Sequence, residues 1–375
     1  MTPLGTLIRD LREALGYSQG RLADLLCESA GRATVTREDV SRWENGKRTV
    51  GPFWLRHFAA VLEVPLEVLE DAKLHRRQFI TSVAATSIAP VVASDLIRSG
   101  FTAALASESL PLDFWRDKLA AYGHDYMSLG AAEIQKRLAH DLLVLQQQLD
   151  EPEMWGIASK LMTLYGKTFP GSDGAKAATW YRIAAEAADR SGDELTRVWV
   201  RGRAAIALGY EGASLGMADM FAEQALKISE VPSLGRLNAV MGKAHVAAIR
   251  GDRRGALDLV EQGRHVFDKV GSEEQTSDYA VPWWRMNVFV SLLAARLGDE
   301  RRAVEAQDRA RDELPEGLPR FATHLEMHRG LMLARAGDKS GGVAYAQAAL
   351  NRLPPEKHSL TLRLLMQEVN GNSGH

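Results

Sequence analysis

The chain has 375 residues and a formal net charge of −2, with 46% hydrophobic and 25% charged residues. This composition is that of a folded globular protein, and the length predicts two or three domains. It excludes a polycation, so any nucleic-acid contact must come from a local basic patch. The single cysteine, Cys27, excludes an intramolecular disulfide framework. No apolar run reaches about 18 residues, so we expect no membrane-spanning helix.

Three regions differ in composition along the chain. Residues 1–71 contain short amphipathic segments with tight turns, residues 72–111 form a linker rich in Ala, Ser and Thr, and residues 112–375 read as helix after helix. Strand signals are nearly absent, because polar and apolar residues do not alternate over any sustained stretch. The sequence therefore predicts an all-α protein.

Five short helices are predicted in residues 1–71. The first spans about 4–15, where leucines recur at helical spacing. Ser18 is a typical N-cap for the second and Thr36 for the third, while Pro52 and Pro65 suit the first turns of a fourth and a fifth. Such a set of helices predicts a compact helix-turn-helix domain.

The residues of this region resemble the Xre/phage-repressor type of helix-turn-helix domain. Four segments carry the resemblance: Leu7-Ile-Arg-Asp-Leu-Arg, Tyr17-Ser-Gln, Val40-Ser-Arg-Trp-Glu-Asn-Gly-Lys-Arg and Leu62-Glu-Val-Pro. The resemblance implies a dimer bound to a palindromic operator in double-stranded DNA. A helix-turn-helix remnant that contacts only protein is the alternative.

The second and third helices supply the expected DNA contacts. The N-terminus of the second helix can receive a phosphate, and the third enters the major groove with Val40 and Trp43 facing inward. The resemblance places the residues after the third helix on the DNA backbone. The expected contacts are Ser18, Gln19, Thr36, Arg37, Glu38, Ser41, Arg42, Asn45, Lys47 and Arg48.

The segment between the second and third helices departs from the family pattern. Between Leu26 and Thr36 the chain has several residues more than the usual tight turn. Either the second helix is longer or the turn bulges.

The linker contains a segment similar to a twin-arginine export signal. Arg76-Arg77-Gln-Phe-Ile-Thr precedes a mildly apolar, Ala-rich stretch. Because such signals act from the N-terminus, we interpret the segment as a linker whose apolar residues can pair across a dimer. An exported repeat protein made from a downstream start is the alternative.

Residues 112–375 predict an α-solenoid of helix pairs that resembles tetratricopeptide repeats. Gly-Asp turns recur at 192–193, 251–252, 298–299 and 337–338. The pairs are predicted at 152–190, 195–229, 234–270, 280–314 and 320–353, with a closing helix at 359–369 and a further pair at 112–149. Small residues suit the points where paired helices cross, and they recur at intervals of 38 to 47 at Ala178, Ala218, Ala256, Ala303 and Ala344.

The first helix of each pair in such an array lines a concave groove. Asparagine and arginine there can hold a peptide backbone and a carboxylate. Alignment on the Gly-Asp turns places six candidate ligand-binding residues in this groove: Asn238, His245, Arg285, Arg296, His324 and Arg335.

Signals of an enzyme are weak. His324 and His328 stand one helical turn apart, but they lack the zinc-protease order and a third ligand. We expect no catalytic residues, no metal site and no cofactor.

A domain of this type followed by tetratricopeptide-like repeats resembles two groups of regulators. One comprises the peptide-pheromone (quorum-sensing) regulators of Gram-positive bacteria, and the other comprises actinobacterial regulators with a similar Arg-Arg-x-Phe linker. The excess of 34 Arg over 12 Lys fits a high-GC genome and favours the second group. We expect a cytoplasmic homodimeric transcription regulator modulated by a peptide, small effector or protein partner. A protein-docking scaffold without an effector is the alternative.

Overall fold

The chain is almost entirely helical wherever its structure is described. A computed structural model describes residues 3–32, 34–64, 66, 69–70, 110–169 and 174–371. Within these ranges there are seventeen α-helices and one short 3-10 helix, Pro355–Lys357, and no strand. The predicted all-α fold is confirmed. The linker expected at 72–111, with its twin-arginine-like segment, lies outside the described residues except for 110–111.

Local capping sets the start of the helices in the N-terminal part. The Ser18 hydroxyl accepts the N–H of Arg21 at 3.0 Å, and Thr36 forms a reciprocal capping box with Asp39. The fifth helix expected at Pro65 lies largely outside the described residues. The four helices described here are α1 (Pro3–Ala14), α2 (Gln19–Ala30), α3 (Arg37–Glu44) and α4 (Pro52–Val61).

The extra residues before α3 lengthen the preceding helix. Of the two alternatives, the structure shows a longer α2, which continues to Ala30. Gly31 then ends it in the left-handed region, with a φ of 63° that favours glycine. A short connection leads from there to the N-cap at Thr36, so the insertion leaves α3 with a regular start.

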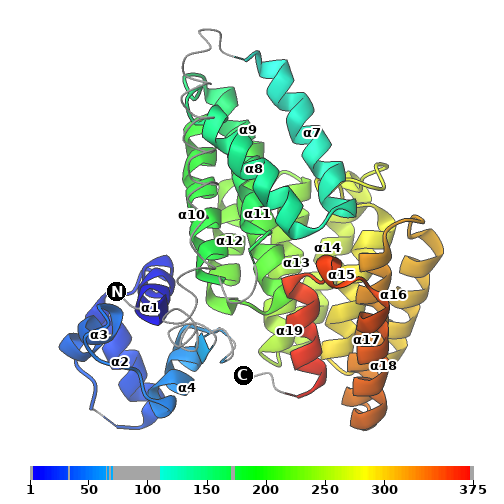
Figure 1. The fold of residues 1–375 in the computed structure, drawn as a ribbon. Coiled ribbons are helices and arrows are strands. Elements are labelled where there is room, and N and C mark those ends of the chain that lie inside the picture. Colours follow the sequence, from blue (N-terminus) through cyan, green and yellow to red (C-terminus); the bar gives the residue numbers. More distant parts are fainter. Residues whose placement is uncertain are drawn as a thin grey trace.

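The remaining helices form the predicted antiparallel pairs (Figure 1). Their order follows the chain, and each of the predicted pairs is present with its boundaries shifted by a few residues at most. The helices are α7 (Leu112–Ser128), α8 (Ala131–Leu145), α9 (Pro152–Gly166), α10 (Gly174–Ser191), α11 (Glu194–Glu211), α12 (Leu215–Ile228), α13 (Leu234–Ile249), α14 (Arg253–Val270), α15 (Trp283–Arg296), α16 (Glu300–Glu313), α17 (Pro319–Arg335), α18 (Lys339–Arg352) and α19 (Leu360–Val369).

The Gly-Asp turns work by joining a helix end to a helix start. Each glycine has a positive φ, between 64° and 107°, which ends the preceding helix. Each aspartate then caps the next helix: Asp252, for example, accepts the N–H of Gly255 at 2.9 Å. Two adjacent residues therefore reverse the chain direction, and that explains why the turns could be found in the sequence.

Small residues lie where paired helices cross, with one correction to the prediction. Ala256 and Ala303, each four residues after the capping aspartate, are fully buried. In the last pair that position is Gly342, which faces Gly330 on α17, whereas the predicted Ala344 is exposed. The close approach of the two helices thus requires a small residue at position 342, and the predicted alanine lies two residues after it.

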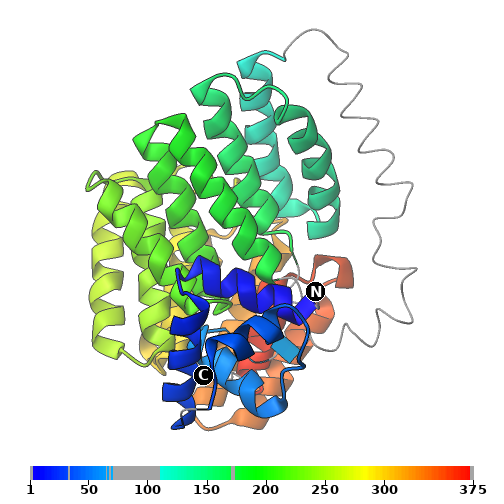
Figure 2. The same cartoon turned by 90° about the vertical axis from the view of Figure 1, so that its left-hand side faces the viewer.

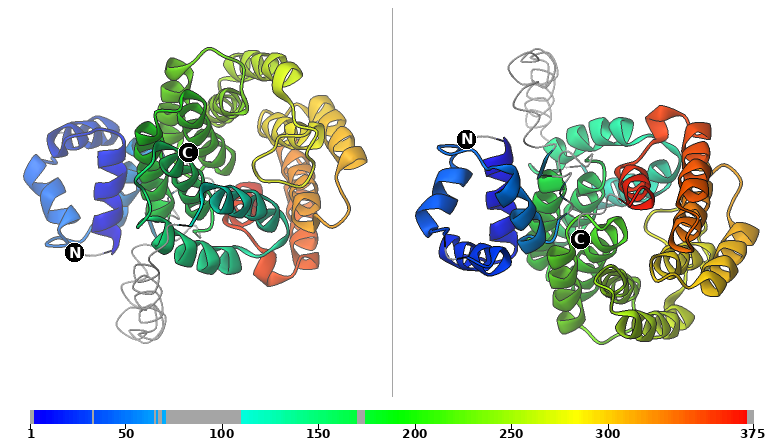
Figure 3. Two further views of the ribbon diagram at one scale, coloured as in Figure 1. Left: turned by 90° about the horizontal axis from the view of Figure 1, so that it is seen from above. Right: turned by 90° about the horizontal axis from the view of Figure 1, so that it is seen from below.

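The helix pairs curl until the two ends of the array meet (Figure 3). On the N-terminal side, the carbonyl of Tyr126 on α7 accepts a hydrogen bond from Arg320 on α17 at 2.8 Å. On the C-terminal side, α19 turns into the curve, where Thr361 donates to Glu211 on α11 at 2.7 Å. Contacts between distant helices therefore bridge the concave side, which leaves a partly open cavity instead of a continuous groove.

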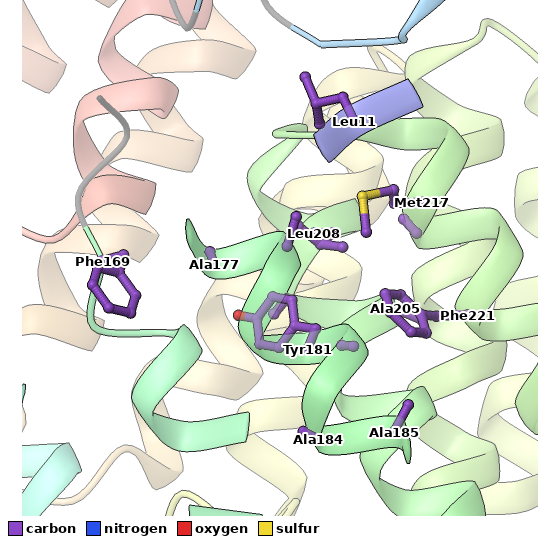
Figure 4. Close-up of a cluster of buried hydrophobic side chains, with 14 of the residues drawn as sticks. Leu11, Phe169, Ala177, Tyr181, Ala184, Ala185, Ala205, Leu208, Met217 and Phe221 are labelled. Atoms are coloured by element: carbon purple, nitrogen blue, oxygen red, sulfur yellow. The ribbon is translucent and has the colours of Figure 1, made fainter. Parts of the chain in front are cut away.

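The N-terminal helices pack directly on the repeats. Helix α1 lies crosswise against α10 (Figure 2), and its Leu11 belongs to one hydrophobic cluster with Leu208 and Met217 (Figure 4). The carbonyl of Glu63 accepts the N–H of Leu215 at 2.9 Å. We call this contact between the N-terminal helices and α10–α12 the docking contact.

Candidate functional site

The outer face of α3 and the turn after it expose a row of polar side chains. Val40 and Trp43 are buried, as predicted, and hold α3 against the domain core. On the opposite side, Ser41 is half-buried. The other expected DNA-contacting residues of this segment are exposed: Thr36, Arg37, Glu38, Arg42, Asn45, Lys47 and Arg48.

A buried carboxylate fixes α3 to the two preceding helices. Glu44 is fully buried, and its two oxygens bind Nε and one terminal nitrogen of Arg12 at 2.6 and 3.2 Å. The side-chain amide of Gln19 donates to the same carboxylate at 2.7 Å. Sequence reasoning assigned Gln19 to DNA alone and missed Glu44, although an acidic residue beside an inward-facing Trp43 was a usable signal.

The exposed residues of this face differ in whether they already form ion pairs or hydrogen bonds within the protein. Arg48 forms an ion pair with Asp39 at 2.6 Å, and Arg42 lies 3.9 Å from the same carboxylate. Asn45 accepts a hydrogen bond from Arg9 at 2.9 Å. Among the described residues no side chain pairs with Arg37, so its guanidinium is available to an external acceptor.

A cavity lies inside the curved array. Its volume is about 80 Å³, counted as the room open to the centres of water-sized spheres. Two of the predicted ligand-binding residues, Arg285 and His324, line it. Further polar walls come from residues that sequence reasoning did not select: Tyr126, Lys167, Arg203, Tyr210, Glu211, Asp278 and Arg320.

Asp278 connects three cations at the cavity wall. One of its oxygens lies 2.7 Å from Arg203 and 2.9 Å from Arg285, while Lys167 contacts both oxygens at 2.7 and 2.6 Å. Although burial raises the pKa of Asp278, the neighbouring cations hold it well below its ordinary value. Burial and repulsion by Arg203 lower the pKa of Arg285 to about 10 and that of Lys167 well below its ordinary value.

Glu211 forms another part of the wall. It is half-buried because one side of it borders the cavity, and its carboxylate accepts the hydroxyl of Thr361. Burial raises the pKa of Glu211 to about 7, even though the Thr361 hydrogen bond lowers it. This carboxyl group therefore changes charge near neutral pH.

The other predicted ligand-binding residues lie elsewhere. Arg296 is buried in an ion pair with Glu368 of α19 at 2.9 Å, and its guanidinium also contacts His245 at 3.3 Å. Asn238 is buried outside the cavity lining. Arg335 is exposed at the end of α17. The expected groove of six residues is thus divided between a cavity wall, an internal network and the surface.

Three histidines surround Tyr210, which lines the cavity together with one of them, His324. The tyrosine hydroxyl lies 2.9 Å from Nε2 of His328 and 3.4 Å from Nδ1 of His324. Burial lowers the pKa of His324 to about 3, and burial lowers those of His245 and His328 well below the ordinary value. These side chains are neutral at physiological pH, and the pair expected to be incidental, His324 and His328, belongs to this internal cluster.

One of the residues that sequence reasoning missed, Arg203, could have been found because it is a charged residue inside an apolar stretch of helix. Arg203 precedes Ala-Ala-Ile-Ala-Leu on α11, and an unpaired arginine rarely lies on such a buried face. Asp278 gave no comparable signal, because it lies in the irregular segment between α14 and α15.

Comparisons with known proteins support part of this description. No curated protein matches the chain. Among solved structures, the chain is similar to the crystal structure of PlcR from Bacillus thuringiensis in complex with the peptide PapR7 and DNA. Sequence identity is 14% and the TM-score 0.30, over 94% of this chain and 100% of that chain. Across the described ranges, every helix is too short or too polar to cross a membrane. Residues 3–72 match the family model of a helix-turn-helix domain, and the N-terminal region is therefore such a domain.

Proposed function

We propose that the protein is a cytoplasmic, sequence-specific DNA-binding transcription regulator whose repeat domain binds an effector that modulates DNA binding. The observation that supports it best is the helix-turn-helix domain at 3–72, whose α3 presents an exposed polar face. In this proposal residues 1–71 bind DNA, residues 72–111 form the linker, and residues 112–375 bind the effector.

In the proposed complex, α3 lies in the major groove. Arg37 and Arg42 can pair with guanine and Glu38 can accept from cytosine, while Lys47 and Arg48 bind phosphates. The docking contact involves α1 and Glu63, and Figure 1 shows α3 on the side of the domain away from the repeats. DNA can therefore reach α3 while the domain stays docked.

We further propose that two copies bind one operator. A single helix-turn-helix module contacts a small half-site, and dimers bind half-sites about one helical turn apart. A symmetric dimer binds a palindromic operator, so a palindromic site selected from random DNA would indicate that two copies bind together.

Selection of binding sites from random DNA tests the proposed function. Wild type should enrich one palindromic site. Arg37→Ala and Arg42→Ala should each weaken binding to it by roughly 1–3 kcal/mol and relax its specificity. Lys47→Ala should instead weaken binding to all DNA sequences alike and reduce the salt dependence of that binding.

Arg254→Ala is the matched control, because Arg254 lies on α14 with its side chain 95% exposed. It should select the wild-type site with unchanged affinity. If the double variant Arg37→Ala/Arg42→Ala enriches the same site as wild type, the assignment of α3 is wrong.

A further inference from the structure

The cavity carries more buried positive than negative charge. Lys167, Arg203, Arg285 and Arg320 line it, opposed by two carboxyl groups, those of Asp278 and Glu211. Three of the four cations share the carboxylate of Asp278. Buried charges without a counter-charge are costly. The wall therefore favours the arrival of an anion.

Two hydrogen-bond donors at this wall have no acceptor. Among the described residues, the Nε atoms of Arg203 and Arg285 are buried without a hydrogen-bond partner, and both side chains are 5% exposed. A buried donor without a partner destabilises the folded state. Both residues line the cavity, so its wall carries two guanidinium groups whose hydrogen bonding within the protein is incomplete.

The size and the remaining walls restrict the ligand. The room open to the centres of water-sized spheres is about 80 Å³, more than a single water needs, so the cavity can hold a small organic molecule. Part of the wall is apolar, formed by Ile206, Val288 and Phe289. A small molecule with one anionic group and an apolar body matches both the cationic and the apolar parts of this lining.

We propose that the cavity binds a small organic carboxylate, whose charge is received by Arg203, Arg285 and Arg320 and whose apolar body lies against Val288 and Phe289. This inference deepens the proposed function, on which it rests, by naming the class of effector. It places the effector in a partly open cavity with a cationic wall instead of along a peptide groove.

Calorimetric titration of the full-length protein without DNA tests the site. The probes are benzoate, its neutral analogue benzamide and inorganic phosphate. Benzoate should bind, with benzamide and phosphate at least about tenfold weaker, because each lacks either the charge or the apolar body. No saturable binding of benzoate at millimolar concentration, or equal binding of benzamide, overturns the proposal.

Arg320→Gln tests the cationic wall without touching Asp278. Arg320 donates to the carbonyl of Tyr126 and takes no part in the three ion pairs of Asp278. The variant should bind benzoate at least about tenfold more weakly. The matched control is Arg335→Gln on the same helix, an exposed residue that should leave benzoate affinity unchanged.

A second variant covers the case in which Arg320→Gln fails to fold. Ala207→Leu fills part of the apolar wall, keeps every cation and should also weaken benzoate binding. A folded variant of either kind that binds benzoate as wild type does overturns the assignment. Because no DNA is present, failure here leaves the DNA-binding part of the proposed function standing, and loss of operator selection leaves the anion site standing.

Discussion

At the scale of single residues, enclosure changes the chemistry of a carboxyl group. Glu211 has a folded-state pKa of about 7 because burial disfavours its charge, whereas the same group titrates near 4.5 in an unfolded chain. Between these values the folded protein holds a proton that the unfolded chain has released. The free energy of unfolding contributed by this group therefore falls as pH rises through that window and stays low above it.

We expect Glu211→Gln to remove this fall in the free energy of unfolding with rising pH. The amide keeps an oxygen that can accept from Thr361 but has no charge to bury. Between pH 5 and pH 8, wild type should lose up to about 3 kcal/mol more stability than the variant, less where cavity water screens the charge. Chemical denaturation at both pH values measures this difference.

Glu313→Gln is the control for this measurement, since Glu313 is exposed at the end of α16. Its pH dependence should match that of wild type. Equal pH dependence in Glu211→Gln and wild type would show that burial does not raise the pKa of this carboxyl group as described.

At the scale of helices, backbone contact decides which residue a position accepts. Gly202 on α11 faces Gly235 on α13 so closely that a Cβ at Gly202 would overlap the carbonyl oxygen of Gly235. Alanine favours a helix over glycine by about 1 kcal/mol, but a backbone carbonyl cannot move aside as a flexible side chain can. The steric cost therefore exceeds the gain in helix propensity.

Gly202→Ala should accordingly destabilise the protein by about 1–3 kcal/mol. Gly20→Ala is the matched control, because the nearest atom to its added Cβ is the Ser18 hydroxyl at an ordinary 3.7 Å. Thermal unfolding of both variants should show a lower midpoint for Gly202→Ala and an unchanged or higher one for Gly20→Ala. A neutral result at Gly202 would mean that α11 and α13 lie farther apart.

At the scale of the whole molecule, one short turn joins the cavity to the helix-turn-helix domain. The turn between α11 and α12 carries Glu211 at its start and Leu215 at its end, and Leu215 donates to Glu63 in the docking contact. Arg250 strengthens that contact by binding Glu63 at 2.6 Å and Asp219 at 2.9 Å. A ligand that moves this turn would act directly on the docked domain.

We expect Arg250→Glu to weaken the docking contact by placing a third carboxylate beside Glu63 and Asp219. Exposed ion pairs contribute about 0.2–1 kcal/mol, so the amide of Leu215 should exchange with deuterium about two- to fivefold faster. Arg254→Glu reverses a charge four residues away, on α14, without a docking partner and should leave that exchange unchanged. Unaltered exchange in both variants would mean that Arg250 does not hold the domain.

Local patterns in the sequence were enough to predict the helices and the turns between them. Ser18 and Thr36 cap helices through bonds to residues three positions away, and the Gly-Asp turns reverse the chain with two residues. These interactions need no distant partner, so they can be inferred from spacing and residue type. The motif around Val40 and Trp43 likewise indicated which face of α3 is exposed.

The interior of the array depended on tertiary structure. Arg296 and Arg335 each stand two residues before a Gly-Asp turn, so the sequence treats them alike. In the structure α19 folds back and buries Arg296 against Glu368, while Arg335 at the end of the array stays exposed. Asp278 meets Lys167 and Arg203 because the curl of the array closes, which no local pattern encodes. Capping and turn formation are short-range, whereas the cavity and its charge result from contacts between residues far apart in the chain.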